Sequence, residues 1–124
     1  MIVAVPAIKA GEGYIVSPHF GRAPFFLLAE ISGSSYKVLE VLRNEYTSHQ
    51  HGRGVSVTEL LKSRGVEAVI ALGVGPGAFT YLKEAGVAVY YVPQEAGLRV
   101  PVEKALELFA QGRLERAHEA REFD

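Results

Sequence analysis

Short apolar runs dominate the first third of the chain and predict three strands. Residues 2–6 and 25–31 are two such runs. Residues 32–35 (SGSS) form a turn sequence that leads into a third strand over residues 36–43. The apolar alternation of this third strand breaks after Val38. The pattern therefore predicts a strand followed by a β-hairpin.

The remainder of the chain alternates between helical and strand patterns. Helical spacing predicts a helix over residues 53–64, which ends before Gly65. Pro76 suits the first turn of a second helix that runs to Gly86, and Pro101 begins a third helix. Continuously apolar strands favour parallel pairing with helices on both faces of the sheet. The two such strands are residues 66–73 and 87–93.

This order of elements predicts one α/β domain over residues 1–124. The first three strands are expected to pair as antiparallel neighbours. Right-handed crossovers place the fourth strand beside the first and the fifth strand outside it. We therefore predict a five-stranded mixed sheet, order 3-2-1-4-5 with strand 2 antiparallel, flanked by helices. Ligand crevices in such sheets lie outside the carboxyl ends of the strands. Four loops are expected on this rim: residues 7–24, 44–52, 73–77 and 93–100.

Composition and charge are those of a soluble globular protein. Apolar residues make up 48% of the chain and charged residues 22%, and the formal net charge is −1. This charge gives no general attraction to nucleic acid or to anionic membranes. No apolar run approaches the roughly 20 residues that span a bilayer, and the N-terminus lacks the features of a signal peptide. We expect a cytoplasmic protein.

Three of the four histidines lie on the predicted rim loops. His49 and His51 form an H-x-H pair, whose imidazole nitrogens suit first-row transition metals. His19, from another loop, would complete a set of three ligands. The alternative is that these side chains are solvated or cap the local backbone. The chain has no cysteine, which excludes disulfides, thiolate zinc sites and a cysteine nucleophile.

An arginine and two glycine-containing segments are the candidates for binding an anion. Arg22 presents a charged fork suited to a carboxylate or phosphate, or it bonds nearby carbonyls to hold its loop. Gly21 would allow a close backbone approach. The segment GVGPGA, residues 73–78, lies between a strand and a helix, where backbone amides can bind an anion. Pro76 removes one of those amides, so a small anion is favoured over a pyrophosphate. The glycines concerned are Gly73, Gly75 and Gly77.

The residues needed for catalysis are missing. Metal-dependent nucleases on comparable sheets need clustered carboxylates, but Glu30 is the only acid in the second strand and Asp124 is the only aspartate. No glycine-flanked nucleophile elbow is present. We therefore expect a binding domain rather than an enzyme.

Several motifs together resemble the dinitrogenase iron–molybdenum cofactor biosynthesis family, which includes NifX-like proteins and the C-terminal domain of NifB. The resemblance covers nearly the whole chain, and HFGRAP is its most specific part. It implies a ribonuclease H-like three-layer fold without nuclease activity. It also implies a carrier, related to nitrogen fixation, that binds an iron–sulfur or iron–molybdenum cofactor, or its precursor, and hands it onward. The motifs are HFGRAPFF (residues 19–26), HG (51–52), the glycine-rich loop and EKALELFAQGRL (103–114).

The family pattern can be carried onto individual residues of this chain. It matches His19, Phe20, Gly21 and Arg22, then His51 and Gly52, then Gly73 and Gly75. The expected partners are cofactor-biosynthesis proteins or an acceptor metalloenzyme, with no nucleic acid or membrane, and the expected state is a monomer or weak homodimer. Without cysteine a bare cluster has no thiolate anchor, which favours transient docking of a preassembled cofactor. The alternatives are a small-anion or nucleotide-binding regulatory module and a protein-interaction scaffold.

Overall fold

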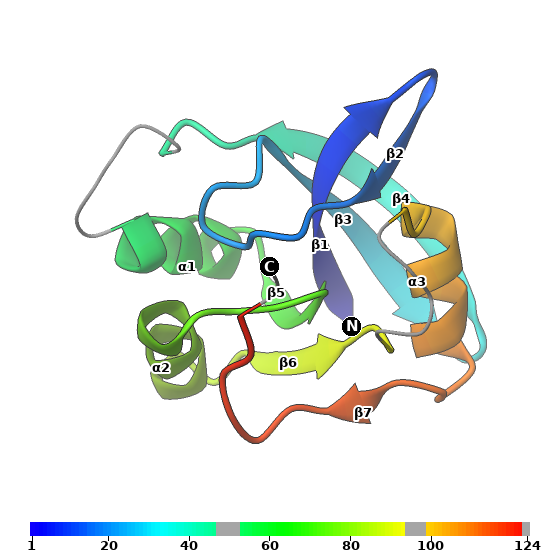
Figure 1. Ribbon diagram of the computed structural model, residues 1–124. Coiled ribbons are helices and arrows are strands. Elements are labelled where there is room, and N and C mark those ends of the chain that lie inside the picture. Colours follow the sequence, from blue (N-terminus) through cyan, green and yellow to red (C-terminus); the bar gives the residue numbers. More distant parts are fainter. Residues whose placement is uncertain (47–52, 94–98, 123–124) are drawn as a thin grey trace.

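A mixed β-sheet separates two helical layers (Figure 1). The computed structural model describes residues 1–46, 53–93 and 99–122. Helices α1 and α2 cover one face of the sheet, and α3 covers the other. The sheet has seven strands in the order β4-β3-β1-β5-β6-β7, with β2 paired to β1 off this path. The elements are β1 (Ile2–Ala10), β2 (Gly13–Val16), β3 (Phe25–Ser32), β4 (Ser35–Arg43), α1 (Arg53–Ser63), β5 (Val66–Ala71), α2 (Pro76–Glu84), β6 (Ala88–Tyr91), α3 (Val102–Ala110) and β7 (Glu115–Arg116).

The five predicted strands occur in the predicted order. They correspond to β1, β3, β4, β5 and β6, so the order 3-2-1-4-5 is confirmed as β4-β3-β1-β5-β6. The second predicted strand, β3, is antiparallel to β1 and β4. Strands β1, β5 and β6 are mutually parallel. The α/β class is therefore confirmed, and the ribonuclease H-like assignment stays a prediction.

The prediction of five strands was wrong in number, because two further strands are present. β1 continues to Ala10, turns through Gly11 and returns as β2, where a single loop over residues 7–24 was predicted. The φ of Gly11 is +61°, a conformation that glycine adopts without steric cost. The second addition, β7, has only two residues, so it carries no readable periodicity. It pairs antiparallel with the end of β6.

Two hydrophobic clusters form the core, one on each face of the sheet. Successive side chains of a strand point to opposite faces, so β1 contributes Val3 and Val5 to the α3 side and Ala4 to the α1–α2 side. All three are fully buried. Val102, Ala105 and Leu106 of α3 close the first cluster. Val57 and Leu61 of α1 and Leu82 of α2 close the second.

Strand β4 forms one edge of the sheet and contains a β-bulge. Leu28 pairs with Glu40 and Ala29 with Val38, so Leu39 is the extra residue. The break in alternation after Val38 in the sequence is therefore a bulge. Val38, Leu39 and Val41 are all exposed on this edge. Bulges twist an edge strand and oppose pairing with another chain.

The C-terminal segment, residues 113–122, crosses the carboxyl ends of β5 and β6. The Arg121 guanidinium donates hydrogen bonds from Nε and Nη2 to the Leu72 carbonyl (3.0 and 2.6 Å) and from Nη2 to the Val92 carbonyl (2.9 Å). Its central carbon lies 4.3 Å from the Tyr91 ring centroid, a cation–π contact. Val74 and Arg121 also exchange two backbone hydrogen bonds, of 2.7 and 2.9 Å. Arg121 therefore joins the ends of two parallel strands.

The Tyr91 hydroxyl gives this segment a further attachment. It donates a hydrogen bond of 2.9 Å to the Glu119 carbonyl. Burial raises the pKa of Tyr91 above its usual value of 10.0, and the neighbouring Arg121 charge acts in the opposite direction. The hydroxyl therefore keeps its proton, and its ability to donate, at neutral pH.

No helix in the described part of the chain is long and apolar enough to cross a membrane.

Replacement of Arg121 should destabilise the fold. Arg121→Met keeps much of the aliphatic stem but leaves the Leu72 and Val92 carbonyls without their charged donor. Loss of these bonds should lower the free energy of unfolding by about 2–3 kcal/mol, measured by urea denaturation. Arg113→Met is the matched control, because Arg113 is an exposed arginine of the same segment. Equal stability of the two variants would contradict the assigned role of Arg121.

Candidate functional site

The His19 loop, residues 17–24, connects β2 to β3 at the carboxyl edge of β1 and β5. Two of its side chains anchor it on the α1–α2 face of the sheet: Phe20 is 3% exposed and Ala23 is fully buried. The ring centroids of Phe20 and Phe26 are 5.5 Å apart in an edge-to-face arrangement. Phe20 is therefore a core residue, as the burial habits of phenylalanine predict.

The start of the loop is held by Ser17, which is 2% exposed. The Ser17 amide donates a hydrogen bond of 2.8 Å to the Pro6 carbonyl in β1. The Ser17 hydroxyl donates to the His19 carbonyl at 2.9 Å and accepts from the His19 amide at 3.2 Å. The backbone of His19 is therefore bonded through both its amide and its carbonyl to one buried serine.

The end of the loop is held by Asn44, the only asparagine in the chain. Asn44 is 4% exposed and follows β4 directly. Its side-chain Nδ2 donates to the carbonyls of Gly21 (3.0 Å) and Ala23 (2.8 Å), and its backbone amide donates to Pro24 at 2.9 Å. Its Oδ1 accepts from the Tyr46 amide at 2.9 Å. Sequence analysis did not identify Asn44, although a lone asparagine after an apolar strand was a visible signal.

His19 and Arg22 are the exposed side chains that this anchored loop presents. One guanidinium nitrogen, Nη2, lies 3.2 Å from Nδ1 and 3.4 Å from Nε2 of the imidazole. In the plane of the ring, Nδ1 and Nε2 form their hydrogen bonds in directions that diverge. A guanidinium nitrogen this close to both ring nitrogens must lie over the face of the ring. The Arg22 nitrogen therefore lies over the face of the His19 ring and not in the plane of the ring. The in-plane bonding directions of Nδ1 and Nε2 therefore point away from the guanidinium.

Two of the three predicted metal ligands lie outside the described residues. His49 and His51 fall within residues 47–52, between β4 and α1. Within residues 1–46, 53–93 and 99–122, no three histidine or acidic side chains are grouped so that they could hold a metal ion. Ligation by His19, His49 and His51 together therefore stays a prediction.

The glycine loop, residues 73–77, lies at the same sheet edge, and the Glu122 side chain lies beside it. Gly73 is buried, Gly75 caps the N-terminus of α2, and Gly77 lies inside the first turn of that helix. A Cβ added to Gly75 would lie 3.3 Å from Oε1 of Glu122. A carboxylate of the chain itself therefore lies beside the helix terminus that was predicted to attract an anion.

The His19 and glycine loops rest on the same core cluster, through Phe20 and Val74. Among the described residues, no hydrogen bond joins the two loops. The structure thus brings together His19, Gly21 and Arg22, and it places Gly73, Gly75 and Gly77 on the same rim without a hydrogen bond between the two described loops. Binding by these glycines stays a prediction.

Asn44 should be essential for the order of the His19 loop. Asn44→Asp keeps the acceptor for Tyr46 but replaces the donor to Gly21 and Ala23 with an oxygen, which their carbonyls repel. We expect a loss of about 2–3 kcal/mol in the free energy of unfolding, from urea denaturation. The adjacent exposed Glu45 provides the control Glu45→Gln. A variant Asn44→Asp as stable as this control would show that the amide does not hold the loop.

Comparisons with known proteins agree with the fold. A family model described as dinitrogenase iron–molybdenum cofactor matches residues 1–112. An uncharacterized protein of Methanocaldococcus jannaschii is 32% identical over 101 residues, which cover 82% of this chain and 81% of that protein.

Two solved structures extend the comparison. The apo form of the orange protein from Desulfovibrio gigas has a TM-score of 0.80 and 27% identity, covering 97% of this chain and 95% of that chain. A putative NifB protein from Thermotoga has a TM-score of 0.71 and 36% identity, covering 92% and 90%. The family match spans every element from β1 to α3, including the His19 and glycine loops. The chain therefore belongs to the dinitrogenase iron–molybdenum cofactor family.

Proposed function

We propose that this protein is a non-enzymatic carrier of an iron–sulfur or iron–molybdenum cofactor, or of its precursor, during metallocluster biosynthesis. The observation that carries the proposal is the contact of Arg22 with the ring face of His19 on an anchored loop, in a chain of this family. Ser17 and Asn44 hold the loop backbone from both ends, so the pair is presented without a large ordering cost on binding. The cargo is the substrate of this protein and not a resident group.

The two side chains suit the two chemical demands of such a cargo. A sulfide-rich cluster is anionic, and the Arg22 guanidinium, whose charge persists at all physiological pH, would offset that charge. An imidazole nitrogen is a suitable ligand for iron. Because Arg22 lies over the ring face of His19, it leaves the in-plane nitrogen directions open to a metal. Gly21, between the two residues, has no side chain to obstruct a bulky cluster.

Attachment through imidazole fits a transfer role better than a storage role. Cysteine thiolates are the usual ligands of iron–sulfur clusters, and this chain has none. A cluster held by His19, and by His49 or His51 if they reach it, would lack a thiolate anchor. We infer that a preassembled cofactor docks transiently and then passes to a cofactor-biosynthesis protein or an acceptor metalloenzyme. A monomer or weak homodimer would suit this exchange.

Features of two related structures support a carrier role. The structure of the orange protein of Desulfovibrio gigas is that of an apo form. The Thermotoga relative is described as a putative NifB protein. The alternative of a nucleotide- or anion-binding regulatory module at the glycine loop gains no support, because Glu122 lies beside Gly75. Nothing among the described residues favours a pure scaffold.

Cofactor binding should depend on His19 and Arg22. Anaerobic titration with isolated iron–molybdenum cofactor, followed by its visible absorption, should show saturable binding to the wild-type chain. His19→Ala and Arg22→Gln should each weaken binding about tenfold or more, equivalent to about 1.4 kcal/mol. Arg22→Lys should retain part of the affinity, because it keeps the charge but loses the planar guanidinium that contacts the His19 ring.

The matched control is Arg113→Gln, which removes an exposed arginine from another part of the surface. It should bind as the wild-type chain does. A double variant, His49→Ala with His51→Ala, tests whether the second loop also ligates. Unaltered binding by His19→Ala and Arg22→Gln would reject the assigned site, and no binding by the wild-type chain would reject the carrier role.

A further inference from the structure

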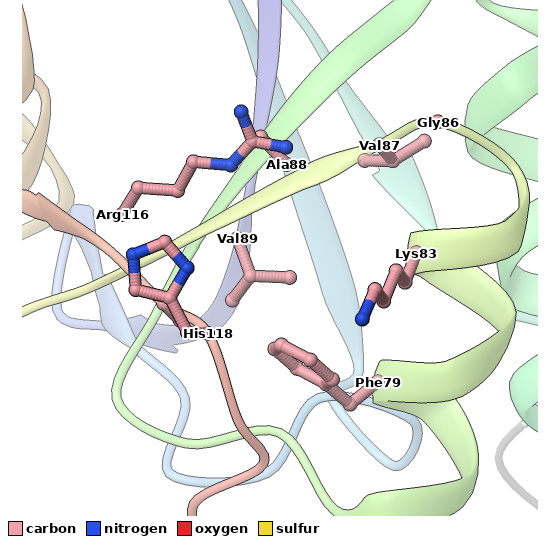
Figure 2. A pocket seen from close by; sticks show the side chains of 9 residues that line it. Phe79, Lys83, Gly86, Val87, Ala88, Val89, Arg116 and His118 are labelled. Carbon is pink, nitrogen blue, oxygen red and sulfur yellow. The ribbon is translucent and has the colours of Figure 1, made fainter.

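The cavity between α2 and the C-terminal segment has its basic groups on two faces of the sheet. Its volume is about 340 Å³, and Lys83 of α2 borders it (Figure 2). Arg116, which also lines it, pairs with Tyr90, a residue that packs on the α3 side. Lys83 shares an adjoining hollow with Glu84 and Glu119. The basic groups of this cavity therefore do not converge on one point.

The edge of the sheet formed by β4 carries an exposed apolar surface on its α3 face. Side chains directly opposite each other in an antiparallel pair lie on the same face. Val38 pairs with Ala29 and Val41 with Leu27, and both partners belong to the core cluster on the α3 side. Val38 is 44% exposed and Val41 38%. These two valines therefore extend the apolar surface of the α3 face into solvent.

The two ends of this apolar surface differ in charge. Arg43, near the carboxyl end, pairs with Phe25 and so lies on the α3 face. Tyr36, near the amino end, packs against the α3-side cluster. Helix α3 contacts β4 (Figure 1). Burial raises the pKa of Tyr36 above its usual value of 10.0, and the negative charges of Glu107 and Glu103 of α3 raise it further. These carboxylates therefore lie near Tyr36, which makes one end acidic and the other basic.

The charges at the two ends are not neutralised within the described part of the chain. Neither Arg43 nor the two glutamates of α3 forms an ion pair there, and all three side chains are exposed. Arg43 and Tyr36 lie roughly 20 Å apart along the strand, at about 3.3 Å per residue. The two ends are therefore too far apart to pair with each other. We call Tyr36, Val38, Val41 and Arg43 the β4 strip.

A two-fold axis through the middle of the β4 strip makes it complementary to itself. Tyr36 and Arg43 lie at equal distances in sequence from the midpoint of Val38 and Val41. A second copy turned about this axis places its Val41 against Val38 and its Arg43 against Tyr36. The same patch is used by both copies in a two-fold dimer. The apolar contact and the contact between opposite charges would therefore each occur twice.

The bulge of β4 favours contact through this face over extension of the sheet. Leu39 is the extra residue and lies between the two valines in sequence. A bulge interrupts the row of backbone groups with which another strand would pair. Packing through side chains does not need that row. Leu39 is itself 43% exposed and adds apolar surface beside the β4 strip.

We propose that the β4 strip is the interface of a symmetric homodimer, in which two β4 strands pack face to face and run antiparallel. Val38 and Val41 form its centre, and Arg43 of each copy lies against Tyr36 and Glu107 of the other. The apolar surface is small, so the dimer is weak, with a dissociation constant of roughly 10 µM to 1 mM. The His19 loop is anchored on the α1–α2 face and stays accessible in both copies. This interface does not rest on the proposed cofactor carriage.

Sedimentation velocity of the full chain, from about 10 µM to 1 mM, tests the dimer. The sedimentation coefficient should rise with concentration to the value of a dimer and no further. NMR spectra over the same range should show concentration-dependent shifts at the amides of Val38, Val41 and Arg43, with those of Gly86 and Val87 unchanged. A chain that remains monomeric at about 1 mM, or one that assembles without limit, would overturn the proposal.

Variants connect the association to the β4 strip. Arg43→Gln should weaken dimerisation about fivefold or more, because it removes the charge that faces the glutamates of the other copy. Lys37→Gln is the matched control, since Lys37 pairs with Glu30 on the opposite face of the same strand and should not affect dimerisation. Both side chains are exposed, so neither change should unfold the chain. Equal dimerisation by these two variants would reject the assigned face.

A charge exchange tests the contact between the two ends. Arg43→Glu should weaken dimerisation more than Arg43→Gln does, because it places like charges together. Adding Glu107→Arg to Arg43→Glu should recover part of the lost affinity, with Glu103 limiting the recovery. A double variant that dimerises no better than Arg43→Glu alone would show that these ends do not meet.

Discussion

The pairing of β1 with three other strands is the constraint that determines which loops can meet. β1 is parallel to β5 but antiparallel to β2 and β3. Because β3 is antiparallel to β1, it begins at the edge where β1 and β5 end. The loop that leads into β3 therefore lies at the carboxyl ends of the parallel strands. The full burial of Val3, Val5 and Ala7 stabilises this central position through apolar area removed from water. The His19 loop, Asn44 and the glycine loop share one rim for this reason.

Elements with strong local signals were predictable. Gly65, Gly86 and Gly112 follow the three helices, and each has a positive φ, so the expected helix ends are confirmed. The rule that crossover connections are right-handed was then enough to predict the order of the five main strands. The β1–β2 hairpin was not predicted: the sequence analysis gives one loop over residues 7–24, although the GEG turn separates two apolar stretches. Helix and strand periodicity thus accounts for the sheet but not for its smallest additions.

The contacts that hold the candidate site join residues far apart in sequence, so periodicity could not reveal them. Sequence analysis left open whether Arg22 bonds nearby carbonyls to hold its loop. In the structure Asn44 bonds the carbonyls of Gly21 and Ala23, whereas the Arg22 guanidinium contacts the His19 ring. His19 and Arg22 were therefore identified as a pair by motif, but the residue that positions them was not. The spacing of His49 and His51 predicts ligation, and these residues lie outside the described part of the chain.

The Arg121 contacts have a consequence for the order in which the molecule is completed. Ribosomes make the chain from the N-terminus, so the Leu72 carbonyl is synthesised 49 residues before the side chain that bonds it. All residues of the two core clusters also precede Arg121. Closure of the rim on this side by Arg121 therefore cannot precede synthesis of the residues that form both core clusters.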